Sequence, residues 1–180
     1  QLGRNFMNHN TTAMIVADPR LPNTSVYQKT IAFNDFYNGD GDGVPLGNVQ
    51  LLGRITANIL KAQAGFLPMP LCRLLARYGF GWYLTSEDLP NPESRVFLRN
   101  GEIVVNWVRS NTIAHDALVR RTKQVMRRAG FPIVLTRTFG RGTTSHQCGT
   151  ARLGNDPRQS VVDTNCRTHD VGNLWIADAS

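Results

Sequence analysis

The chain has 180 residues, of which 41% are apolar and 18% are charged, and its net charge is +7. This composition is typical of a globular protein with its own core, and no apolar run reaches the ~18 residues that span a membrane. The positive charge is scattered apart from one cluster, Arg120–Arg128. Because no aromatic platform or nucleic-acid-binding motif accompanies that cluster, we expect a solvated helix face and no nucleic-acid partner.

The first half of the chain predicts one strand and two helices. The β-branched run over residues 11–17 predicts a strand. Apolar residues at three- and four-residue steps predict a helix over residues 48–64, although Gly53 weakens it. A shorter helix is predicted over residues 71–78, ending at Gly79.

The second half is richer in strand signals. We expect strands within residues 79–88 and 131–138, and a hairpin over residues 94–108 that turns at Asn100-Gly101. A final buried strand is predicted over residues 174–177.

A helix is predicted over residues 111–129, with a buried stripe of Ala114, Leu118, Val125 and Ala129. Because strands and helices do not alternate regularly, the fold class is predicted as α+β, an antiparallel sheet with helices packed on one face.

His146 lies two residues before Cys148, and Cys166 lies three residues before His169. The second spacing is ordinary for zinc and the first is poor, so taken alone His146 could be a base, a metal ligand or a turn residue. We predict no metal site, and a zinc-binding module is kept as an alternative. The odd number of cysteines indicates a reducing compartment, and a cytoplasmic location is expected.

The last 36 residues carry a more specific pattern, which resembles the closing signature of the glucose–methanol–choline (GMC) family of FAD-dependent oxidoreductases. The matching residues are His146, Gly149-Thr150, Arg152-Leu153-Gly154, Asp156-Pro157, Ser160 to Asp163, Asn173-Leu174 and Asp178 to Ser180. Leu153 stands where the family usually has Met. Two further stretches also resemble the family: residues 3–9, with Asn8 where Asp is common, and residues 87–98.

The resemblance implies an FAD-dependent oxidoreductase (EC 1.1 class) that acts on the CH-OH group of an alcohol or sugar. It implies that hydride passes to flavin N5 while His146 accepts or positions the hydroxyl proton. Contacts to FAD are expected from Asp178, Ala179 and Asn5.

Two features of the family pattern are not found in this sequence. The Gly-x-Gly-x-x-Gly turn that cradles the FAD pyrophosphate is absent, and a second catalytic His or Asn would lie past Ser180. We therefore expect a substrate-binding part whose partner is the FAD-binding half of the same enzyme, and which is inactive alone. The expected division is 1–10 leaving the flavin half, 11–140 the substrate-binding domain and 141–180 the catalytic and flavin-contact signature. The alternative is a non-catalytic binding or interaction module.

Overall fold

The chain forms two compact units in the computed structural model, which describes residues 1–39, 41, 43–140, 142 and 146–180. The sheet unit consists of Asn10–Ser86 and Thr112–Phe139. The loop unit consists of Gln1–His9, Glu87–Asn111 and Gly140–Ser180. Among the described helices, none is both long and apolar enough to cross a bilayer.

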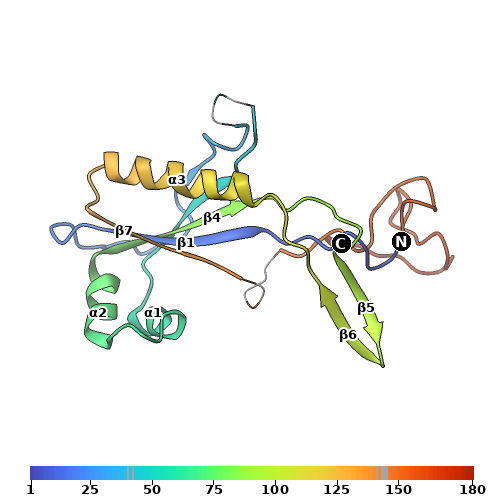
Figure 1. Cartoon of the computed structure of the whole chain (residues 1–180), viewed down its shortest axis with the longest axis horizontal. Helices are drawn as coiled ribbons and strands as arrows, with labels where there is room; N and C mark the ends of the chain where they lie inside the picture. The colour runs from blue at the N-terminus through green and yellow to red at the C-terminus, as the bar shows by residue number, and fades with distance from the viewer. Residues whose placement is uncertain (40, 42, 141, 143–145) are drawn as a thin grey trace. The chain divides into compact units, whose positions relative to one another are not determined.

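The sheet unit is built on five antiparallel strands in the order β2-β3-β4-β1-β7 (Figure 1). β1 lies between β4 and β7, so that Met14 pairs with Trp82 on one side and with Thr136 on the other. The strands are β1 (Asn10–Ala17), β2 (Ala32–Phe33), β3 (Asn48–Gly53), β4 (Gly79–Ser86) and β7 (Ile133–Thr138). The predicted α+β class with an antiparallel sheet is confirmed.

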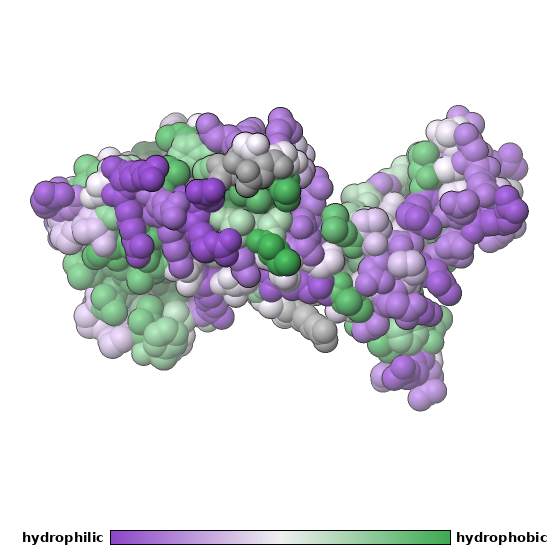
Figure 2. Space-filling view, turned by 45° about the horizontal axis from the view of Figure 1, so that its top comes forward, coloured by the Kyte–Doolittle hydropathy of each residue, from purple (hydrophilic) through white to green (hydrophobic). Residues whose placement is uncertain are grey.

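The helices of this unit cover both faces of the sheet, whereas one face was predicted. α3 (Thr112–Arg128) packs on the face that carries the buried side chains of Met14 and Val16. Ile15 points to the opposite face, because successive strand residues alternate. There it packs with the cluster formed by α1 (Ala57–Gln63) and α2 (Met69–Tyr78). In Figure 2 apolar surface is visible at the end of the unit where α1 and α2 lie, and the outer surface of α3 is hydrophilic.

The predicted helix over residues 48–64 is wrong in its first part. Residues 48–53 form β3, in which buried Val49 and Leu51 alternate with less buried neighbours. Gly53 has a φ of 74°, which takes the chain out of the strand, and Thr56 caps the helix that follows by accepting a hydrogen bond from Ile59 N. The apolar spacing of residues 48–53 fits the period of a helix and that of a strand. Pairing with β4 stabilises the strand.

The helix predicted over residues 111–129 is confirmed within a residue as α3, and its predicted stripe is half right. Ala114 and Leu118 are buried, but Val125 is 40% exposed and Met126 is buried instead. The helix is rotated so that polar Thr122 also faces the sheet. The Thr122 hydroxyl donates a hydrogen bond to the carbonyl oxygen of Leu118, four residues earlier, so this buried polar group has a partner.

The loop unit contains one hairpin, formed by β5 (Arg95–Arg99) and β6 (Glu102–Asn106). Its tip is Asn100-Gly101, as predicted, and both residues have positive φ, 54° and 80°. The strand predicted over residues 174–177 is wrong. Trp175 forms a single bridge with Arg167 and is 57% exposed, because the described part of this unit offers that run no second strand to bury it.

The boundaries of the two compact units do not coincide with those of the three predicted segments. The chain does pass from one unit to the other near residues 10 and 140. The hairpin segment, Glu87–Asn111, clusters with the two terminal segments instead of with the sheet. The functional division into 1–10, 11–140 and 141–180 stays a prediction.

Candidate functional site

Three distant segments of the loop unit meet around residues 3–7. On one side Met7 N donates to the Cys148 carbonyl at 2.9 Å, and Cys148 N donates back to Met7 at 3.1 Å. Gly3 N donates to the Thr150 carbonyl at 2.8 Å. On the other side Val96 N donates to the Gly3 carbonyl at 2.7 Å. The N-terminal segment therefore lies between the hairpin and the C-terminal signature.

Gly149 of the signature is required by this packing. A Cβ at this position would lie 2.1 Å from the Asn5 carbonyl oxygen, and the φ of Gly149 is +92°. Asn5, a predicted FAD contact, is itself 4% exposed with a φ of 60°. Its carbonyl oxygen is thus taken up by the contact with Gly149, and its FAD contact stays a prediction.

A buried carboxylate, Asp88, ties the hairpin to the N-terminal segment. Its Oδ2 accepts from Trp107 Nε1 at 2.6 Å and from Asn8 N at 3.3 Å. Its Oδ1 accepts from Ser110 N at 3.0 Å and from the Ser110 hydroxyl. Several donors converge on one carboxylate that is 8% exposed. This is the arrangement that lets a charged group be buried at moderate cost.

His146, the predicted base, lies beside a second histidine, His9. The two ring centroids are 5.1 Å apart and the rings meet edge to face at 72°. His146 is exposed, with a φ of 60°, while His9 is half-buried. Burial is the main cause that lowers the pKa of His9, and His146 lowers it further, against the opposing effect of Glu87 and Asp88.

The zinc alternative is not supported by the geometry. No group of three or more His, Cys, Asp or Glu residues suited to a metal ion occurs in the described part of the chain, which includes all four proposed ligands. Burial, together with Asp88, raises the pKa of the Cys148 thiol, which disfavours the thiolate that zinc requires. His169 already has partners, because its Nε2 lies 2.9 Å from Ser160 Oγ and 3.0 Å from the Gly154 carbonyl oxygen.

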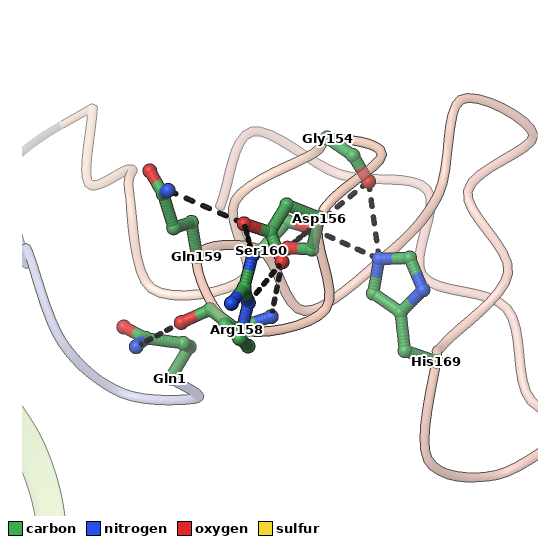
Figure 3. Close-up of polar contacts among 7 residues, drawn as sticks. All are labelled: Gln1, Gly154, Asp156, Arg158, Gln159, Ser160 and His169. Carbon is green, nitrogen blue, oxygen red and sulfur yellow. Dashed lines mark hydrogen bonds and ion pairs between the residues drawn. The ribbon is translucent and has the colours of Figure 1, made fainter.

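The contacts of His169 belong to a turn that holds the signature in shape (Figure 3). Ser160 Oγ donates to either the Asp156 carbonyl, at 2.7 Å, or that of Gly154, at 2.9 Å. Asp156 forms an ion pair with Arg158 at 3.1 Å, and this arginine chiefly lowers the pKa of the Asp156 carboxyl. The family-like Gly, Asp-Pro and Ser positions are therefore structural here.

The predicted FAD contacts near Ser180 are accessible. Asp178 and Ala179 are both exposed. Asp178 Oδ1 accepts from Ser180 N at 2.8 Å and from the Ser180 hydroxyl, and these bonds lower the pKa of the carboxyl. In the part of the chain that the structure describes, both of these bonds go to Oδ1, and Oδ2 is left to accept from another group. Such a carboxylate oxygen can accept a hydrogen bond from a ligand hydroxyl. Asp178 is therefore chemically suited to contact the hydroxyl groups of a flavin side chain.

Sequence reasoning missed His9 and Asp88, although both lie in stretches that resemble the family. The signal that could have found them is register. Met7 pairs with Cys148 in an isolated antiparallel bridge, and the rings of His9 and His146 lie 5.1 Å apart two residues beyond it.

Residues 102–180 match the C-terminal model of the GMC oxidoreductase family. The resemblance to this family that the sequence carries is thus confirmed over these residues.

Two curated relatives are similar to the chain. The fructose dehydrogenase large subunit of Gluconobacter japonicus is 30% identical over 111 residues, which cover 56% of this chain and 20% of that protein. The 6'''-hydroxyparomomycin C oxidase of Streptomyces lividus is 40% identical over 62 residues, which cover 33% of this chain and 11% of that protein. The chain thus spans about a fifth or less of the relatives it matches.

Proposed function

We propose that this chain is the substrate-binding part of an FAD-dependent oxidoreductase that acts on the CH-OH group of an alcohol or sugar. The family match of residues 102–180 supports an oxidoreductase. Both relatives are named as redox enzymes, a dehydrogenase and an oxidase. The FAD-binding half of the same enzyme is its proposed partner, and a cytoplasmic location stays part of the proposal.

The observation that carries this function is the position of His146 in the signature. Its exposed imidazole follows from a tight left-handed backbone turn, φ 60°, two residues before the bridge between Cys148 and Met7. An imidazole can accept a proton near neutral pH, and a rigid backbone limits the directions from which it can do so.

In the proposed reaction His146 takes the hydroxyl proton of the substrate. Bound FAD would supply the acceptor for the hydride of the same carbon. Asp178 would accept a hydrogen bond from a flavin-side-chain hydroxyl, next to Ala179. Asn5 would add a further contact to FAD from beside Gly149.

The test uses the longest natural polypeptide that contains this chain. We expect it to purify with flavin, and an alcohol or sugar should bleach the flavin absorbance under anaerobic conditions. His146→Gln should slow that bleaching by roughly 100-fold or more, which is the usual contribution of a positioned base.

Gln147→Ala is the matched control, because Gln147 is the exposed neighbour of His146 in the chain. It should reduce flavin at the wild-type rate. Normal bleaching in His146→Gln would remove the base assignment. A correctly folded polypeptide that binds no flavin would remove the proposed function.

A further inference from the structure

The backbone brings the side chains of His9 and His146 close together. The antiparallel bridge between Met7 and Cys148 has hydrogen bonds in both directions, at 2.9 and 3.1 Å. His9 lies two residues after Met7, and His146 lies two residues before Cys148. Beyond this isolated bridge the left-handed backbone of His146, with a φ of 60°, leaves the two ring centroids 5.1 Å apart.

The His9 side of this pair is firmly held. The preceding residue, Asn8, is 2% exposed and its N–H donates to the buried carboxylate of Asp88. His9 itself is half-buried, whereas His146 is exposed. One imidazole is therefore part of the packed unit, and the other extends from it toward solvent.

The electrostatic surroundings favour a neutral His9. The titratable groups that face it are His146 from the signature and the carboxylates Glu87 and Asp88 from the segment before the hairpin. Burial is the largest effect, and it lowers the pKa of His9 below 6.5 despite the two carboxylates. The lowered pKa favours an uncharged His9 ring near neutral pH.

We infer that His9 is a positioning residue for His146: its ring packs edge to face against the His146 imidazole and sets the direction in which that imidazole meets its substrate. This inference rests on the proposed function of His146. Edge-to-face aromatic contacts have a defined geometry, and a small change in the direction of a general base lowers the rate sharply.

The first experiment tests the pair without flavin, by NMR titration of the histidine ring protons in the 180-residue chain. His146→Gln should raise the pKa of His9, because His146 is one of the groups that lower it. His169→Gln is the matched control, since His169 has its own partners at Ser160 and Gly154. It should leave the pKa of His9 unchanged. An unchanged His9 pKa in His146→Gln would overturn the inference.

The second experiment measures flavin reduction in the longer polypeptide. His9→Ala should lower the reduction rate constant roughly 10-fold or more, with little change in substrate affinity. His9→Phe keeps an aromatic ring and should recover most of that loss.

The pH profile separates positioning from a general structural effect. Because protonation changes the His9 ring, the wild-type rate should fall more steeply at low pH than the rate of His9→Phe, whose ring does not titrate. A folded His9→Ala variant with the wild-type rate and profile would overturn this inference alone. A flavin-loaded wild type that no alcohol or sugar reduces would overturn the proposed function as well, while the NMR result would still decide whether the pair exists.

Discussion

The carbonyl oxygen of Asn5 occupies the space that a side chain on Gly149 would need, 2.1 Å from the position of a Cβ. This contact joins the N-terminal segment to the catalytic signature. Gly149 thus has a tertiary role in addition to its positive φ of 92°.

Gly149→Ala should therefore destabilise the loop unit by about 3 kcal/mol, the sum of a positive-φ penalty and a backbone clash. Hydrogen exchange of the Met7 and Val96 amides measures this locally. Gly101→Ala is the matched control, because Gly101 has a φ of 80° and no atom within 4 Å of its Cβ position. It should cost about 1–2 kcal/mol, and an equal loss in both variants would contradict the role of the contact.

Asp88→Ala should destabilise the loop unit by about 3 kcal/mol, because it removes the buried acceptor of the Trp107 indole N–H. The fluorescence of Trp107, which is 5% exposed, should also shift to the red as water enters. Asp170→Ala removes an exposed carboxylate of the same unit and should change the free energy of unfolding by less than about 0.5 kcal/mol. A small effect at both positions would show that the buried carboxylate is dispensable.

His115 should be a neutral imidazole that carries its proton on Nδ1. Ser86 Oγ donates to the Leu46 carbonyl, so it accepts from His115 Nδ1 at 2.9 Å. In that tautomer Nε2 is free to accept from Thr12 Oγ1, which lies 2.7 Å away. Nitrogen-15 NMR shifts identify the tautomer directly, and a proton on Nε2 would contradict this assignment.

Ser86→Ala should cost the sheet unit about 1–3 kcal/mol, because His115 is fully buried and loses an acceptor. Ser25→Ala is a control in the same unit, since it changes a serine whose amide, rather than its hydroxyl, makes the contact with Asn23. Its effect on the unfolding of the sheet unit should be within about 0.5 kcal/mol.

The carboxyl of Asp18 should titrate with a pKa of about 2, because Arg20 donates to it from both its side chain and its backbone. The pKa is lowered on folding, so the stabilisation is present above 3.8 and is lost as pH falls toward 2. Arg20→Gln should raise the Asp18 pKa in an NMR titration, whereas Lys29→Gln should leave it unchanged. An Asp18 pKa near 3.8 in the wild-type chain would contradict the prediction.

Local sequence signals predicted the parts of this fold that local physics controls. The Asn100-Gly101 turn needs positive φ at both positions, and few residues other than Asn and Gly accept it. The 17-residue helix α3 is long enough for its spacing to be unambiguous.

Residues 48–53 could not be assigned in this way. Their apolar residues fit a helix as well as a strand, and the pairing with β4, thirty residues away in sequence, determined the outcome. Residues 174–177 could not be assigned from local sequence either. Their apolar run predicts a buried strand, but Leu174 is 47% exposed.

The sequence by itself determined the family, through an ordered set of residues from His146 to Ser180, and it identified His146 as the candidate base. It could do so because chemistry and tight turns depend on residue type at short range. Only the tertiary structure decided that His9 lies beside His146, that Asp88 is the shared acceptor of Trp107 and Asn8, and that helices cover both faces of the sheet. Those relationships depend on which distant segments pair and in which register, and pairing is set by backbone hydrogen bonds and burial summed over the whole unit.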